Sequence, residues 1–325
     1  MQAIVMREFG DPSVLRFGNH PEPVARPGWV SVRLEASALN WHDVLVRRGL
    51  YRSPLPHVPG ADGAGTRTDT GEDVVILPLL FWGSREAAPE AGWEILGDHR
   101  PGTYAELVSV PEECVVPRPA GLSVAQAAAL PLVGVTSFRA LFVRGRLQRG
   151  ESVLILGAGG GVATMATSLA AAQGARVVVT SSDSSKIAAA RELGALDGVD
   201  HHHPGWVEHA RSLTPGGRGF DLVLDSVGRW SESVRCLRPG GRCVVLGASA
   251  AEEVQLELRP FYFGQFELIG STMGSPSDMA GLVRFMTDHD VPPPIVDRTY
   301  GLEDAAAAHE RLEAGKSFGK LVLCH

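Results

Sequence analysis

The stretch "SVLILGAGGGVATMA", residues 152–166, constrains the fold more than any other part of this sequence. A short apolar run leads into four glycines within five residues, Gly157, Gly159, Gly160 and Gly161, and a run of small residues follows. Glycines permit a tight turn and let backbone N–H groups approach a phosphate, whose charge is stabilised by the positive end of the following helix. The segment therefore predicts a strand, a phosphate-binding turn and a helix.

The spacing of these glycines departs from the strict G-x-G-x-x-G motif. Aligned on the start of the helix, the three motif positions read Ala158, Gly160 and Ala163. Alanine is tolerated at the last position, where the side chain only touches the neighbouring strand. A glycine-rich turn alone can be purely structural, but this one lies in a strand–turn–helix–strand unit of about thirty residues. We predict that it binds a dinucleotide.

The rest of the chain divides into three stretches by pattern. Residues 1–121 contain short strand-like runs broken by Pro and Gly, as in "WVSVRLEA" and "YAELVSV". A capping box at Ser123 and Gln126 then predicts the start of a helix. From residue 151 apolar strands alternate with helices, which predicts a doubly wound parallel sheet. After residue 264 the pattern is mixed, with a final strand in "GKLVLCH".

Composition excludes several classes of function. The net charge is −7 and the basic residues are scattered, which argues against binding to nucleic acid or to a membrane surface. The four cysteines show no Cys-x-x-Cys spacing, no apolar run reaches the length of a membrane span, and "MQAIVMREFG" is no signal peptide. We expect a cytoplasmic protein in a reducing compartment, with a small molecule as substrate.

The end of the second strand bears on which dinucleotide binds. An acidic residue there would bind a ribose 2′-hydroxyl and repel a 2′-phosphate. Instead "ARVVVT" is followed by Ser181 and Ser182, with Lys186 one helical turn on, and these suit a 2′-phosphate. Asp183 is interpreted as a residue at the helix N-terminus. The competing interpretation is that Asp183 reaches the ribose and selects NAD(H), which stays possible, but we predict NADP(H).

The motifs together resemble a known family. The segments "LPHVPGADGAG", "GTYAELVSVP", "AAALPLVGVTSFRAL", "VLILGAGGGVAT", "FDLVLDSVG", "LRPGGRCVVLGA" and "FGKLVL" are similar to the medium-chain dehydrogenase/reductase superfamily, in particular its quinone-oxidoreductase and zinc-type alcohol-dehydrogenase-like branches. The resemblance implies a β-rich, GroES-like, partly open barrel in residues 1–124 and 265–325. It implies a Rossmann-type dinucleotide-binding domain in residues 125–264, with the active cleft at the junction.

The positions that bind zinc in the zinc-dependent members differ here. Asn40, Ala61 and Asp62 stand where those members have a Cys and a His-Glu pair. An amide and a methyl group cannot replace a thiolate and an imidazole, and the region that carries a second zinc in many relatives has no cysteine. No zinc is therefore expected. A different metal site has no supporting spacing among these candidates: His42, Asp43, His57 and His99. The run His201–His203 predicts an exposed turn.

The resemblance also implies the residues of the active site. Asn40 would donate to the substrate or near the nicotinamide ribose, and Tyr51 would donate to the substrate oxygen or relay a proton. The alternative for Tyr51 is an aromatic residue that closes a loop, and Asp43 is as well suited to orienting backbone as to chemistry. His42 is expected on the helix surface.

Further cofactor contacts are implied at the carboxyl ends of strands. These are Thr136, Gly160, Gly161, Val162, Val227, Leu246, Gly247, Gly319 and Lys320. The sequence thus predicts an NADPH-dependent reductase of quinones or α,β-unsaturated carbonyl compounds that works without zinc. Two alternatives stay open: a zinc-independent alcohol or aldehyde dehydrogenase, and a cofactor-binding protein without turnover. A homodimer formed through "FELIGST" is also expected.

Overall fold

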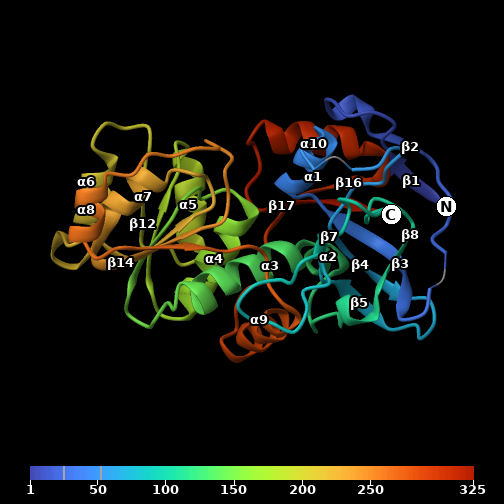
Figure 1. Cartoon of the computed structure of the whole chain (residues 1–325), viewed down its shortest axis with the longest axis horizontal. Helices are drawn as coiled ribbons and strands as arrows, with labels where there is room; N and C mark the ends of the chain where they lie inside the picture. The colour runs from blue at the N-terminus through green and yellow to red at the C-terminus, as the bar shows by residue number, and fades with distance from the viewer. Residues whose placement is uncertain (25, 52) are drawn as a thin grey trace. The chain divides into compact units, whose positions relative to one another are not determined.

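The computed structural model describes residues 1–24, 26–51 and 53–325, which form two compact units (Figure 1). Unit 1 comprises residues 1–135, 274–283 and 293–325, and unit 2 comprises residues 136–273 and 284–292. The first division therefore falls after Val135, where the sequence predicted residue 124. It lies within helix α3 (Pro131–Phe138), and helix α9 (Pro276–Asp288) is divided in the same way.

Unit 2 is built on a six-stranded sheet in which every neighbouring pair is parallel. The strand order is β12-β11-β10-β13-β14-β15, so the first strand in the chain is central and the order reverses beside it. This is the Rossmann order, and it confirms the predicted fold class. The strands are β10 (Ser152–Ile155), β11 (Arg176–Thr180), β12 (Asp197–Val199), β13 (Phe220–Asp225), β14 (Leu237–Val245) and β15 (Glu267–Gly270).

The helices of unit 2 connect these strands. Helix α4 packs against β10 and β11, and its run of small residues allows the close approach. Apolar side chains from the central strands, including Leu154, Val178 and Val223, form one buried cluster. The helices are α4 (Gly161–Ala172), α5 (Ser184–Glu192), α6 (Trp206–Ser212), α7 (Trp230–Cys236) and α8 (Leu258–Phe263). Short helical turns lie at Arg139–Arg144 and Pro215–Gly217.

Unit 1 contains a seven-stranded, mainly antiparallel sheet in the order β16-β17-β3-β4-β5-β9, with β8 also paired to β3. Alternate residues of the long strand β3 are buried, as expected where one face of a strand packs on a core. The strands are β3 (Trp29–Ala38), β4 (Asp62–Arg67), β5 (Asp73–Ile76), β8 (Leu107–Pro111), β9 (Val115–Pro117), β16 (Val296–Gly301) and β17 (Lys320–Cys324). Two further pairs are β1 (Gln2–Val5) with β2 (Arg16–Asn19), and β6 (Leu79–Leu80) with β7 (Glu94–Ile95).

One pairing in this sheet positions the candidate site. The last strand, β17, runs antiparallel to β3, with Val322 opposite Ala38. The start of β17 therefore lies beside the end of β3, although the two segments are far apart in the sequence (Figure 1).

The remaining helices of unit 1 are α1 (Trp41–Arg47), α2 (Val124–Ala129) and α10 (Ala305–Glu313), with short turns at Pro12–Val14, Glu112–Cys114 and Leu302–Asp304. The predicted capping box begins α2: the Ser123 hydroxyl accepts from the Gln126 N–H, and the Gln126 side chain accepts from the Ser123 N–H. None of the helices in the described parts of the chain combines the length and apolar character that crossing a membrane requires.

Candidate active site

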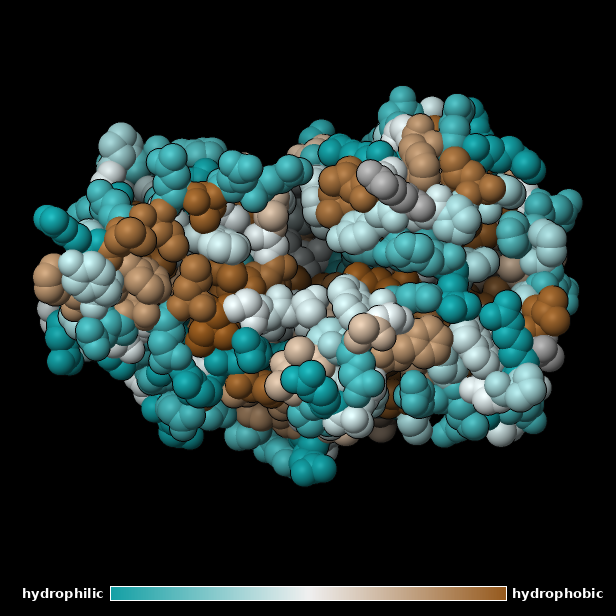
Figure 2. Space-filling view, in the orientation of Figure 1, coloured by the Kyte–Doolittle hydropathy of each residue, from teal (hydrophilic) through white to brown (hydrophobic). Residues whose placement is uncertain are grey.

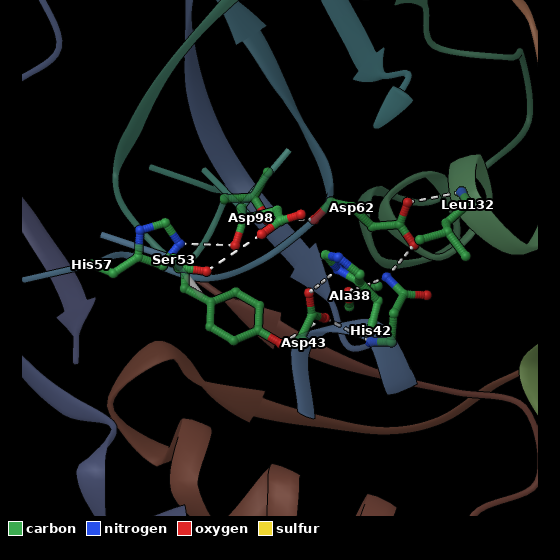
Figure 3. Close-up of polar contacts among 12 residues, drawn as sticks. Ala38, His42, Asp43, Ser53, His57, Asp62, Asp98 and Leu132 are labelled. Carbon is green, nitrogen blue, oxygen red and sulfur yellow. Dashed lines mark hydrogen bonds and ion pairs between the residues drawn. The ribbon is translucent and has the colours of Figure 1, made fainter. Parts of the chain in front are cut away.

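The end of β3 and the start of α1 place Asn40 and Asp43. Asn40 has extended backbone and is the N-cap of α1, and its N–H donates to Asp43 Oδ2 at 2.7 Å. Asp43 is fully buried, so its carboxylate fixes the first turn of the helix from inside (Figure 3). This contact agrees with the interpretation that Asp43 orients neighbouring backbone.

A buried polar cluster joins Asn40 to Asp62 and Lys320, and we call these three residues the lysine cluster. The Lys320 ammonium donates to Asn40 Oδ1 at 2.5 Å and to Asp62 Oδ2 at 3.0 Å. The Asn40 amide donates to the same carboxylate oxygen at 3.0 Å and to the Ala38 carbonyl at 3.3 Å. Both amide hydrogens of Asn40 are thus donated within the protein, where the sequence suggested donation to a ligand.

The second oxygen of Asp62 is also held. It accepts from the Leu132 N–H at 2.8 Å, which ties the cluster to the start of α3 (Figure 3). Burial raises the pKa of Asp62, while Lys320 and Asn40 act in the opposite direction. Because Asp62 is fully buried and Lys320 is 4% exposed, each charge depends on the other for compensation.

His42 lies in the first turn of α1, two residues after Asn40, and the expectation that it lies on the helix surface is wrong. Its side chain is 9% exposed and its ring packs against Tyr51, with 4.8 Å between ring centroids. Helix α1 has only seven residues and most of them are buried, so the His42 side chain is covered although the sequence pattern predicted that it would face solvent. Tyr51 itself is 37% exposed, and burial, with the negative charge of Asp98, raises its pKa.

Asp98 interacts electrostatically with both His42 and Tyr51. It is 5% exposed and accepts from the Ser53 hydroxyl at 3.4 Å, and burial raises its pKa. His57 is held separately, by a contact of 2.8 Å between Nε2 and the Gly97 carbonyl oxygen (Figure 3).

A second buried layer supports Asp43, and sequence reasoning missed it. The Tyr104 hydroxyl donates to Asp43 Oδ2 at 3.2 Å and lies 3.3 Å from His309 Nε2. His309 is fully buried, which lowers its pKa to about 4. The only sequence signal was a His in the "AAAAHERLEAG" helix, whose partners are distant in the chain.

In unit 2 the glycine-rich turn has the geometry that a phosphate requires. Gly157 has a positive φ of 81° and its N–H donates to the Thr180 hydroxyl at 3.1 Å. Gly160 is the N-cap of α4, and within the described chain no side chain caps this end. A Cβ added at Gly160 would be 3.9 Å from the nearest heavy atom of the protein, so the space beside the helix end is open. The turn fits a dinucleotide pyrophosphate.

The other predicted cofactor contacts of unit 2 lie after the carboxyl ends of two strands or in helices α3 and α4. Val227 follows β13, and Leu246 and Gly247 follow β14. Thr136 is buried in α3, and its hydroxyl oxygen has no hydrogen-bond partner among the described residues. Val162 accepts from the Ser137 hydroxyl at 3.1 Å through its carbonyl, which attaches the first turn of α4 to α3. Gly319 and Lys320 belong to unit 1.

The residues after β11 also have defined places. Asp183 is the N-cap of α5, as the sequence indicated, and its carboxylate accepts from the N–H and the hydroxyl of Ser185. These hydrogen bonds lower its pKa. Lys186 lies over the glycine-rich turn, because a Cβ on Gly159 would be 2.6 Å from its Cδ and 3.0 Å from its Nζ. Ser181 is buried and accepts from the Asp183 N–H, whereas Ser182 is exposed.

Metal-ligand chemistry is poorly matched in unit 1. The positions at which the family resemblance implies zinc ligands, Asn40, Ala61 and Asp62, supply an amide, a methyl group and a carboxylate that is already paired with Lys320. Among residues 1–24, 26–51 and 53–325, no group of three His, Cys, Asp or Glu side chains could hold a metal ion. The residues present do not fit a catalytic zinc.

The sequence and the fold were compared with those of known proteins. Residues 26–120 match the model of the alcohol dehydrogenase GroES-like domain, and residues 161–288 match that of the zinc-binding dehydrogenase. The chain is 32% identical to the zinc-type alcohol dehydrogenase-like protein C1773.06c of Schizosaccharomyces pombe, over 91% of each chain. It is 31% identical to a quinone oxidoreductase of Pseudomonas aeruginosa, over 97% of each. A crystal structure of an NAD-dependent alcohol dehydrogenase superposes with a TM-score of 0.94, at 38% identity and with all of both chains covered.

Fold, glycine-rich turn and relatives define an NAD(P)H-dependent oxidoreductase. The chain belongs to the medium-chain dehydrogenase/reductase superfamily.

Proposed function

We propose that this oxidoreductase uses NADPH to reduce a quinone or an α,β-unsaturated carbonyl compound and that it needs no zinc. The bound nicotinamide supplies the hydride, and the protein binds and orients the two reactants and excludes water. The lysine cluster is the observation that carries the proposal, since it presents a buried positive charge at the positions that hold zinc in the zinc-dependent relatives.

Lys320 is the group that we propose polarises the acceptor oxygen. An ammonium has three N–H donors, and in the described chain two of them are used by Asn40 and Asp62. The third is available for the oxygen on which negative charge develops during hydride addition. A fixed donor in a buried site stabilises such charge strongly because little reorganisation is required. Asn40 and Asp62 then act by holding the ammonium in place.

Three observations favour NADPH over NADH. The Asp183 carboxylate is occupied as a helix cap, Lys186 lies over the glycine-rich turn, and Ser182 is exposed beside them. This set offers a positive charge and a hydroxyl to a 2′-phosphate, and the Asp183 carboxylate is engaged by Ser185. Fluorescence titration that finds NADH binding at least as tightly as NADPH would contradict this preference.

A screen of acceptors tests the reaction. Purified protein with NADPH is offered quinones, enones and simple aldehydes, and the nicotinamide absorbance is followed. Consumption with quinones or enones is expected, and consumption with simple aldehydes alone would reject the proposal. Elemental analysis of the same sample should find far less than one zinc per chain, and near-stoichiometric zinc would overturn the zinc-free mechanism.

The substitution Lys320→Met tests the lysine cluster. It leaves the buried Asp62 carboxylate unpaired, so the free energy of unfolding should fall by about 3–5 kcal/mol. The double variant Lys320→Met/Asp62→Asn removes both charges and should regain most of that stability. If Lys320 polarises the acceptor, kcat of the double variant stays about 10²- to 10³-fold below wild type. Recovery of both stability and kcat would show that Lys320 only compensates Asp62.

A zinc-independent alcohol or aldehyde dehydrogenase is the second candidate. The solved structure with 38% identity is described as an NAD-dependent alcohol dehydrogenase, which favours it. Oxidation of secondary alcohols with NAD⁺, without turnover of quinones or enones, would select this candidate.

We also propose that the protein is a cytoplasmic homodimer. Strand β15 ends the strand order of the parallel sheet, and next to it in the chain α8 exposes Leu258, Tyr262 and Phe263. Figure 2 shows hydrophobic residues gathered on the part of the visible face that carries α8. An exposed sheet edge beside apolar side chains favours pairing with a second copy. The four cysteines are free thiols, which suits a reducing compartment.

A further inference from the structure

We propose that His42, held by Asp43, is the acid that gives the proton to the reduced acceptor. The inference rests on the proposed reductase function, because hydride addition alone leaves an anion that must be protonated.

The unmet hydrogen-bonding capacity of His42 is the first argument. Neither of its ring nitrogens has a hydrogen-bond partner among the described residues, although both atoms are buried. A buried polar group without a partner loses its hydration and gains nothing in return, so such groups in native proteins need an explanation. A ligand that accepts a hydrogen bond from this ring would remove the cost.

The position of Asp43 gives the ring a defined orientation. His42 Nδ1 lies 3.7 Å from Asp43 Oδ1, and that oxygen is also without a hydrogen-bond partner in the described chain. A modest approach of the two groups, or one bridging water, completes a carboxylate–imidazole pair. Asp43 would then bind Nδ1–H and leave Nε2–H for the acceptor. Asp43 cannot turn away, because its other oxygen is held by the Asn40 N–H and the Tyr104 hydroxyl.

The charges around the ring suit a proton donor. From its own helix His42 faces Asp43, and from the segment before β8 it interacts with Asp98, which also interacts with His57 and His99. Two carboxylates can balance a positive ring, and the two further histidines oppose this only in part. Tyr51, which packs on the ring, is the weaker acid because burial and Asp98 raise its pKa.

The step balances as follows. Hydride addition to a quinone or enone brings two electrons and one hydrogen, oxidises NADPH to NADP⁺ and leaves the acceptor as an oxyanion. The Nε2–H bond of protonated His42 breaks, its electron pair stays on the nitrogen, and an O–H bond forms on the acceptor. Neutral His42 regains a proton from solvent water, so no further oxidant or reductant is needed.

The test is the pH profile of NADPH-dependent reduction by the full-length protein, measured with a quinone or enone that wild type reduces. A general acid must be protonated to act, so wild-type kcat should fall as the pH is raised. His42→Gln should lower kcat at neutral pH about 10²- to 10³-fold and abolish that fall, with NADPH affinity within twofold of wild type. His42→Ala should regain activity when imidazole is added. The matched control is His202→Gln, an exposed histidine of unit 2.

The outcomes separate the two proposals. If wild type binds NADPH but reduces no quinone or enone, the proposed function fails and this inference falls with it. If wild type is active and His42→Gln keeps both its kcat and the alkaline fall, only the role of His42 is overturned. Loss of activity in His42→Gln without imidazole rescue of His42→Ala, and with the pH profile unchanged in shape, would assign a structural role and also overturn it.

Discussion

At the scale of single residues, unit 1 buries an unusual set of polar side chains, and each needs a partner. Asp62 accepts three hydrogen bonds, from the Lys320 ammonium, the Asn40 amide and the Leu132 N–H. Asp43 Oδ2 accepts from the Asn40 N–H and the Tyr104 hydroxyl, and this hydroxyl lies 3.3 Å from His309 Nε2. His42 has no hydrogen-bond partner for either ring nitrogen in the described chain, and neither has Asp43 Oδ1, which lies 3.7 Å from His42 Nδ1. Hydrogen-bonded polar side chains hold their positions firmly, whereas buried side chains without hydrogen bonds need an explanation, and a bound ligand would supply one for His42.

The buried His309 predicts a pH dependence of stability. Its pKa is lowered from 6.5 to about 4 in the folded protein, so the folded state resists protonation that the unfolded state accepts. The stabilisation is fully present above pH 6.5 and is lost as pH falls towards 4, by roughly 3 kcal/mol in all.

Urea unfolding of wild type and His309→Gln at pH 7, 5.5 and 4.5 checks this dependence. The variant should lose less stability over this range, whatever its stability at pH 7. His325 is retained in both proteins, so any part of the slope that it contributes is common to the two. Equal slopes would show that His309 binds protons alike in the folded and unfolded states, and thus that burial does not lower its pKa.

At the scale of elements, local patterns identified the helices and strands that their own residues specify. The glycine-rich turn, the α2 capping box and the apolar strands β10, β11, β13 and β14 are examples. The short strands β12 and β16 and the helix α8 were missed, because their residues lack a clear period of two or 3.6. The contact of Lys320 with Asp62 was also beyond sequence reasoning, since it depends on the pairing of β17 with β3.

The start of α4 supports a prediction about cofactor binding. Gly160 has an ordinary φ of −73°, and a Cβ there would meet no protein atom closer than 3.9 Å. The substitution Gly160→Ala should therefore change the free energy of unfolding by less than about 0.5 kcal/mol. If the pyrophosphate lies against this backbone, the added methyl group occupies its space, and the Kd for NADPH should rise at least about tenfold, or about 1.4 kcal/mol.

Isothermal titration of wild type and Gly160→Ala measures the effect. Gly18→Ala is the matched control, because a Cβ at Gly18 also meets open space but lies in unit 1. Unchanged NADPH affinity in Gly160→Ala would place the cofactor away from the glycine-rich turn.

At the scale of the whole molecule, unit 2 is inserted into unit 1. The chain builds most of unit 1, completes the parallel sheet, and then returns to add β16 and β17 to the first sheet. The lysine cluster therefore combines Asn40 and Asp62, which precede unit 2 in the chain, with Lys320, which follows it. The sequence identifies unit 2 because strands and helices begin to alternate there. It does not reveal which buried side chains strand β17 will contact.

The exposed apolar residues of α8 predict an assembly. Leu258, Tyr262 and Phe263 are 76%, 52% and 74% exposed, and β15 beside them offers a free sheet edge in the described fold. A second copy that covers them would bury this apolar area, whereas a carboxylate introduced there would have to be desolvated without a partner.

Light scattering should give wild type twice the 34.5 kDa of one chain, and Phe263→Asp should shift the mass to that of one chain. Leu196→Asp is the matched control, since Leu196 is 56% exposed but precedes β12 at the other end of the strand order. A wild-type protein with the mass of one chain, or Phe263→Asp with the mass of two, would reject α8 and β15 as the dimer surface.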